Sequence, residues 1–100
     1  MSARLTIQRR AELEMNRAVI WYEEIRIGLG REFLADLRTA LQQISQCPSS
    51  FPVDYRHSRR ALLSRFPYRV YFIVDNDDGH VAIIGVLHTS QSKSRLRRRL

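Results

Sequence analysis

The chain has 100 residues and a formal net charge of +7, and 16 of its 17 basic residues are arginine. This length is enough for one compact domain with a modest core, and the 44% of hydrophobic residues excludes a disordered polyelectrolyte. No apolar run approaches the ~18 residues of a membrane span, and residues 1–10 lack the apolar stretch of a signal peptide.

The N-terminal half predicts a short strand followed by two helices. Residues 4–7 alternate as in an edge strand. From Arg10 onward the apolar residues recur at helical spacing, which predicts a helix with one buried face. That face consists of Ala11, Met15, Ala18, Tyr22 and Ile25.

The helical period also assigns the flanking residues. It places Glu14 on the outer side of the first helix and Trp21 beside the buried stripe, where we expect the ring to pack within a helical hairpin. Gly28 is suited to a left-handed turn at the helix end. A second helix is predicted over residues 31–46, with Asp36 on its outer side, and Pro48 follows it.

The C-terminal half predicts strands. Residues 48–58 contain two prolines and three serines and are expected to form a loop, and strands are predicted over 59–65, 68–75 and 80–88. Asp-Gly within 76–79 indicates a tight hairpin. The fold class is therefore α+β, with a β-αα-βββ order and a helical hairpin packed on a small, mostly antiparallel sheet. Residues 1–90 form a single domain, and residues 91–100 form a basic C-terminal tail.

The strand over 68–75 predicts two different faces. Tyr68, Val70, Phe72 and Val74 alternate with the other residues and would face the helical hairpin. Arg69 and Tyr71 would then lie together on an open face, opposite the core.

The positive charge lies mainly in the second half of the chain. Residues 1–50 carry a net +1 and residues 51–100 a net +6. An anionic partner follows from this distribution, either nucleic acid or an acidic protein segment. Arginine favours a specific contact over a merely soluble surface, because its planar fork matches carboxylate and phosphate groups.

Several kinds of chemistry are not supported. His57, His80 and His88 have no metal-ligand spacing, and we expect neither a metal nor a cofactor. Cys47 has no partner for an internal disulfide, which favours a reduced, cytoplasmic protein with no membrane partner. Gly28 and Gly30 do not form a phosphate-binding loop, and Ser90 near His88 lacks a partnering acid.

Arginine, tyrosine and histidine remain as candidate functional residues on the predicted strands. Such a set can bind an RNA backbone and stabilise a phosphoryl transition state, or it can bind an acidic peptide through charge-assisted hydrogen bonds. The residues are Arg59, Arg60, Arg65, Arg69, Tyr71 and His88.

Five segments, in order, resemble the RelE/ParE superfamily of toxin–antitoxin toxins, and the ParE or plasmid-stabilisation branch in particular. They are AELEMNRAVIWYEE (11–24), GLGREFL (28–34), ISQCPSSFP (44–52), RRALLSRFPYRVYFIV (59–74) and IIGVLH (83–88). The resemblance implies a small toxin held inactive by a cognate antitoxin, whose extended acidic segment wraps around it. The RelE branch cleaves mRNA in the ribosomal A site, whereas the ParE branch is associated with poisoning DNA gyrase.

The residues that match favour the ParE branch. Arg60 and Arg69 match two basic positions of RelE-like nucleases, but a further basic position falls on Leu62. The arginine and the tyrosine that such nucleases carry near the C-terminus fall near Thr89 and Arg95. His88 completes the VLH ending that is usual in the ParE-like branch, although the Arg, acid and Pro that often follow it are replaced by the sequence of 89–93.

Three hypotheses follow. The first is a ParE-like toxin that binds a protein target, DNA gyrase, and is not an enzyme. The second is a RelE-like ribosome-dependent mRNA endonuclease that uses Arg60, Arg69 and His88. The third is a degenerate, non-toxic basic interaction module. The residues predicted to contact the antitoxin or target are Arg59, Arg60, Arg65, Arg69, Tyr71, His88, Lys93, Arg95, Arg97 and Arg98.

Overall fold

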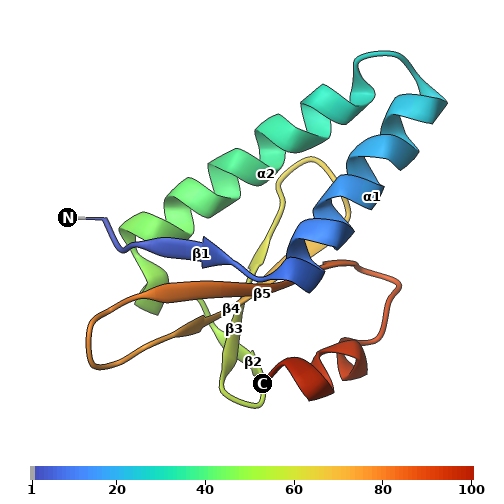
Figure 1. The fold of residues 1–100 in the computed structure, drawn as a ribbon. Coiled ribbons are helices and arrows are strands. Elements are labelled where there is room, and N and C mark those ends of the chain that lie inside the picture. The colour runs from blue at the N-terminus through green and yellow to red at the C-terminus, as the bar shows by residue number, and fades with distance from the viewer. Residues whose placement is uncertain (1) are drawn as a thin grey trace.

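A five-stranded mixed sheet carries a helical hairpin on one side and the C-terminal segment on the other (Figure 1). The computed structural model describes residues 2–100. The strand order is β1-β5-β4-β3-β2, with β1 parallel to β5 and the other pairs antiparallel. The elements are β1 (Leu5–Ile7), α1 (Arg9–Ile25), α2 (Leu29–Gln46), η1 (Pro48–Ser50), β2 (Val53–Tyr55), β3 (Ser58–Leu62), β4 (Tyr68–Val74), β5 (Val81–His88) and η2 (Lys93–Arg99).

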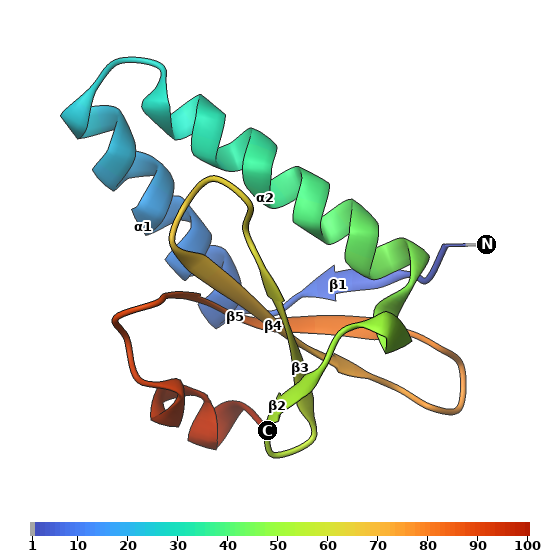
Figure 2. The same ribbon diagram turned by 180° about the vertical axis from the view of Figure 1, so that it is seen from behind.

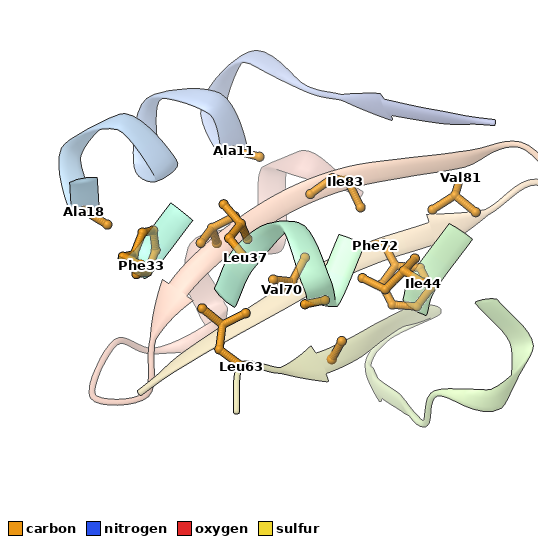
Figure 3. Packing of buried hydrophobic residues seen from close by; sticks show 13 residues of the cluster. Ala11, Ala18, Phe33, Leu37, Ile44, Leu63, Val70, Phe72, Val81 and Ile83 are labelled. Carbon is orange, nitrogen blue, oxygen red and sulfur yellow. The ribbon is translucent and has the colours of Figure 1, made fainter. Parts of the chain in front are cut away.

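The main core lies between the helical hairpin and the sheet (Figure 3). Helix α1 contributes the small residues Ala11 and Ala18, so the hairpin can approach the sheet closely, and α2 contributes Phe33, Leu37 and Ile44. Val70 and Phe72 of β4 are fully buried beneath them. Tyr22 stacks on Phe33 at a centroid distance of 5.4 Å, which confirms its predicted place in the hairpin.

The turn between α1 and α2 depends on two glycines and one carboxylate. Gly28 has a φ of +91°, the left-handed conformation predicted for it. The Glu23 carboxylate accepts hydrogen bonds from the amides of Gly28 and Gly30, and thus binds the otherwise unpaired N–H groups at the start of α2. A Cβ on Gly30 would lie 2.7 Å from the Val19 carbonyl oxygen, so glycine permits the close approach of the two helices.

The fold class predicted from the sequence is confirmed, with one strand more than expected. Residues 53–55, predicted as part of a loop, form the edge strand β2. Its pairing with β3 is short and irregular. A strand of this kind shows neither the length nor the alternation of apolar and polar residues by which strands are predicted from sequence. The strand predicted over 59–65 ends at Leu62, because residues 64–66 turn back toward α2.

The prediction of an open face on the sheet is wrong. Tyr68, Val70, Phe72 and Val74 do face the helical hairpin. On the other face, however, Tyr71 is fully buried, because the C-terminal segment folds over it. Figure 2 shows this segment from behind, on the side of the sheet away from α1 and α2.

Asp36, predicted on the outer side of α2, is buried with 6% of its surface exposed. Its carboxylate accepts hydrogen bonds from the backbone amides of Arg65 and Phe66, at 2.9 and 3.1 Å. The amide and hydroxyl of Ser64 also donate to it. Although burial raises the pKa of Asp36, these hydrogen bonds lower it by more, so the carboxylate is stabilised in its charged form. This one side chain holds the β3–β4 turn against α2.

We expect Asp36→Ala to lower the free energy of unfolding by about 3 kcal/mol, because it leaves several buried donors without an acceptor. A folded-state pKa below the unfolded value makes this stabilisation complete above about pH 4 and progressively lost in stronger acid. Urea unfolding of the wild type and Asp36→Ala measures the loss, and the same comparison with Asp36→Asn across this pH range tests its dependence on the carboxylate charge. A stability difference that does not shrink in acid would contradict the assignment.

Candidate functional site

The C-terminal segment packs on the sheet through every third residue. A 3₁₀ helix has three residues per turn, so Lys93, Leu96 and Arg99 of η2 lie on one side. Leu96 is fully buried against Ile84 and Leu87 of β5 and Tyr71 of β4, which together form a second core. The Ser92 hydroxyl accepts a hydrogen bond from the Ser94 amide and caps the helix. The predicted basic tail is therefore an ordered part of the fold.

A carboxylate links this segment to the two strands beneath it. Asp54 of β2 accepts a hydrogen bond from the Tyr71 hydroxyl at 2.9 Å and pairs with the Lys93 ammonium. Burial and the bond to Asp54 raise the pKa of Tyr71 to about 12. Burial also raises the pKa of Asp54, but the hydrogen bonds and charge of its partners lower it by more. Tyr71 is thus a structural hydrogen-bond donor, and it is poorly suited to acid–base chemistry near neutral pH.

A second ion pair joins the C-terminal segment to α1. Arg99 donates to both carboxylate oxygens of Glu14, at 2.9 and 3.0 Å, and only 9% and 15% of the two side chains is exposed. The prediction that Glu14 lies on the outer side of its helix is therefore wrong. Glu14 also accepts from the Val86 amide, and Arg99 donates to the Ile84 carbonyl oxygen. Because β1 pairs with β5 only up to Ile83, these two side chains provide hydrogen-bond partners for one amide and one carbonyl of β5 beyond that point.

A β-bulge and a glycine make room for the C-terminal segment. Tyr71 is opposite Gly85 and Phe72 is opposite Ile83, so the register shifts at Ile84. A Cβ on Gly85 would lie 2.6 Å from the Leu96 side chain. A side chain at this position would displace Leu96, so glycine allows η2 to pack closely on β5.

Arg69 and His88 are held by the segment that precedes η2. The Arg69 guanidinium donates to the carbonyl oxygen of Gln91 at 2.8 Å and lies over the Tyr71 ring. The His88 ring nitrogen Nδ1 lies 2.8 Å from the Ser90 hydroxyl. These predicted site residues therefore have internal roles in positioning residues 88–92.

The ten predicted contact residues do not form one cluster. Arg59 donates to the Phe51 carbonyl oxygen at 2.5 Å, and Arg65 pairs with Glu32 at 3.0 Å. Three more of the ten also form hydrogen bonds or ion pairs within the molecule, namely Arg69, Tyr71 and Lys93. Arg60 and His88 are half-buried, and the exposed residues Arg95, Arg97 and Arg98 have no ion pair within residues 2–100.

A groove lies between α1 and the C-terminal segment, with a volume of about 530 Å³. We call it the α1 groove, and it lies between Arg10, Leu13, Arg17 and Trp21 on one wall and Gln91 and Arg95 on the other. Trp21 is 61% exposed, so the prediction that its ring packs within the hairpin is wrong. Sequence reasoning missed Arg10 and Arg17 as candidates. A signal existed in Leu13, Ile20 and Ile27, which are apolar, seven residues apart and outside the core stripe.

Two further kinds of site are absent from the part of the chain that the structure describes. Residues 2–100 contain no group of three or more His, Cys, Asp and Glu residues arranged to hold a metal ion. Among these residues, no helix combines the length and apolar character needed to cross a membrane.

Comparison with known proteins identifies the family. A family model described as the ParE toxin of the type II toxin–antitoxin system parDE matches residues 5–93, most of the chain. The chain belongs to the ParE toxin family. No match was found among curated protein sequences. The superfamily and branch inferred from the sequence motifs are thereby confirmed.

Solved structures of both branches share the fold of this ParE-family protein. A chain of the chromosomal ParDE system from P. aeruginosa superposes with a TM-score of 0.75 at 15% identity, covering 87% of this chain and 96% of that one. The RelBE2 toxin–antitoxin complex from Mycobacterium tuberculosis gives 0.64 at 17% identity, covering 88% and 99%. A substituted E. coli RelE in the free state gives 0.60 at 16% identity over the full length of both chains.

We expect Tyr71→Phe to change how stability depends on alkaline pH. The raised pKa means that the wild type is stabilised below about pH 10 and loses that stabilisation as the pH rises toward 12. The stability difference between wild type and Tyr71→Phe should fall by about 2–3 kcal/mol over this interval. Urea unfolding measures it, and ultraviolet titration of tyrosinate follows the ionisation. A difference that is constant with pH would contradict a raised pKa.

We expect strong coupling between Glu14 and Arg99 in a double-mutant cycle. Breaking one side of this largely buried pair with Glu14→Gln or Arg99→Met should cost about 3 kcal/mol, and the coupling free energy should exceed about 1 kcal/mol. The exposed pair of Arg26 and Glu32, at 3.0 Å, is the control and should couple by less than 1 kcal/mol, roughly. Equal coupling in the two pairs would show that the Glu14–Arg99 pair does not anchor η2.

Proposed function

We propose that this ParE-family toxin acts by binding a protein target, DNA gyrase, and that a cognate antitoxin with an acidic extended segment neutralises it in the cytoplasm. The family match over residues 5–93 supports a toxin of the ParE branch. Structures of relatives titled as ParDE and RelBE systems support an antitoxin partner. The net charge of +7 supports an acidic partner segment.

The C-terminal helix η2 covers one face of the sheet, and this coverage favours a binding mechanism over catalysis. In the RelE-like alternative, this face would hold the groups that grip and cleave mRNA. Here Tyr71 is fully buried and its pKa is raised to about 12, and the Arg69 guanidinium donates to the Gln91 carbonyl oxygen. Both groups stabilise the folded structure, and they do not form a free acid–base pair for RNA cleavage.

The accessible members of the predicted set are the proposed partner contacts. Arg95, Arg97 and Arg98 are exposed, Arg65 is exposed while it pairs with Glu32, and Arg60 and His88 are half-buried. Arginine forks on an exposed surface suit the carboxylates of an acidic segment. The nuclease alternative assigns Arg60, Arg69 and His88 to the mRNA instead.

Purified protein is expected to inhibit DNA supercoiling by gyrase and to leave ribosome-bound mRNA uncut. Adding the product of a neighbouring reading frame that encodes a DNA-binding domain and an acidic tail should restore supercoiling. Supercoiling gels and primer extension on translated mRNA make the two measurements. Cleavage in the ribosomal A site that is lost in Arg69→Ala would replace this proposal with the nuclease. Inactivity in both assays would favour a non-toxic interaction module.

A further inference from the structure

The side of α1 that faces away from the sheet carries exposed apolar residues that the core does not use. Leu13 is 38% exposed, Ile20 is 59% exposed, and Ile27, just past the end of the helix, is 90% exposed. Leu13 and Ile20 are seven residues apart, so they lie on one side of the helix, opposite the buried Ala11 and Ala18. Apolar side chains exposed next to one another mark an interaction surface more often than isolated ones do.

Charged residues of opposite sign flank this apolar row at its two ends. Arg17 precedes Ile20 and Glu24 follows it, and both are exposed. Neither forms an ion pair within residues 2–100. Because Arg17 and Glu24 are seven residues apart, they lie on the same side of Ile20. We call the surface formed by Leu13, Arg17, Ile20 and Glu24 the outer face of α1.

The outer face of α1 is complementary to a second copy of itself. When two such helices pack antiparallel about a two-fold axis at Ile20, positions before the axis on one copy meet positions after it on the other. At 1.5 Å per residue, Arg17 and Glu24 lie roughly 4.5 and 6 Å from that axis, so each arginine faces the glutamate of the other copy. Leu13 lies toward the turn that contains Ile27 in the second copy.

The distribution of charge along the chain permits this contact although the net charge is +7. Residues 1–50 carry a net +1 and residues 51–100 a net +6, so pairing through α1 joins the nearly neutral halves of two copies. The turn between α1 and α2 also extends beyond the sheet (Figures 1 and 2), which leaves the end of the outer face accessible.

We propose that the outer face of α1 is a homodimer contact, in which two copies of this chain pack antiparallel about Ile20 with reciprocal ion pairs between Arg17 and Glu24. The contact is small, so the dimer dissociates on dilution through the micromolar range. This inference goes beyond the proposed function and does not rest on it, because it requires neither gyrase nor an antitoxin.

A second copy fits the outer face better than a partner of one charge sign. An acidic protein segment pairs favourably with Arg17 but brings its carboxylates close to Glu24, and the phosphates of a nucleic acid do the same. Only a partner whose charge also reverses along its length satisfies both ends, and α1 itself has that order.

Charge exchange tests the reciprocal ion pairs, with the dissociation constant of the dimer measured by sedimentation equilibrium. Arg17→Glu and Glu24→Arg each place like charges at two symmetric contacts and should weaken the dimer about tenfold. Arg17→Glu/Glu24→Arg restores opposite charges and should return the dissociation constant to within about threefold of the wild type. A double variant as weak as the two single effects combined would contradict the pairing.

Two equally exposed apolar residues give a matched test of the axis. Ile20 on α1 and Leu62 on β3 are both 59% exposed. Because Ile20 meets its own copy, Ile20→Glu opposes two carboxylates in the contact and should weaken the dimer by roughly tenfold or more. Leu62→Glu should change the dissociation constant by less than about threefold. Circular dichroism and urea unfolding establish that each variant is folded.

Cross-linking locates the axis directly, since a residue on a two-fold axis lies next to its own copy. Cys47 is the only cysteine of the chain and is exposed, so the test starts from Cys47→Ser. In that background Ile20→Cys should form a covalent dimer with a short bis-maleimide. Gln42→Cys, at an exposed position of α2, should remain monomeric under the same conditions.

A chain that is monomeric at concentrations into the millimolar range overturns the inference. A dimer that Ile20→Glu leaves unchanged also overturns it, because the contact then lies elsewhere on the molecule. If the chain alone is monomeric and Ile20→Cys is protected from maleimide only when another protein is bound, the outer face belongs to that protein and the inference is wrong. Gyrase inhibition is measured separately and stands in each of these cases.

Discussion

The ion pair between Glu14 and Arg99 is the contact on which the arrangement of the C-terminal segment depends. Strand β1 leaves the sheet after Ile7, so β5 has an uncovered edge from Ile84 onward. The two side chains bond to that edge and to each other. A short strand end that would otherwise be open to pairing with another chain is thereby occupied. The same pair helps to hold η2, together with the Lys93–Asp54 pair and the buried Leu96 side chain, and η2 carries one wall of the α1 groove.

A sheet covered on both faces changes where this protein can meet a partner. The apolar groups Tyr71, Ile84 and Leu87 are removed from water by Leu96, and the bulge at Ile84 with Gly85 provides the space. The side chains that remain exposed to a partner lie around the edges of the sheet and along α1. Exposed arginine side chains suit contact with carboxylate groups, through their planar donor fork.

The helical hairpin and the three long strands could be predicted, because each has an apolar pattern of its own period. The pattern also placed Tyr22 and Val70 in the core correctly. It failed for Glu14, Asp36 and Tyr71, whose polar atoms are buried by partners far away in the chain. Arg99 is 85 residues from Glu14, and the amides that bind Asp36 are about 30 residues away. The spacing of apolar residues predicts only which residues share a face of one helix or strand. It therefore cannot predict contacts between residues far apart in the chain.

The Val86 amide of β5 has an acceptor on a different element, the Glu14 side chain of α1. Most β5 residues from Val81 to His88 are paired with β4 backbone, but the Val86 N–H donates to the Glu14 carboxylate at 3.0 Å. That carboxylate is oriented by Arg99, so the amide loses its oriented acceptor whenever η2 leaves the sheet. Hydrogen exchange at this amide therefore reports opening of the C-terminal segment, separately from unfolding of the sheet. The exchange rate of this one amide thus measures the local stability of the C-terminal segment.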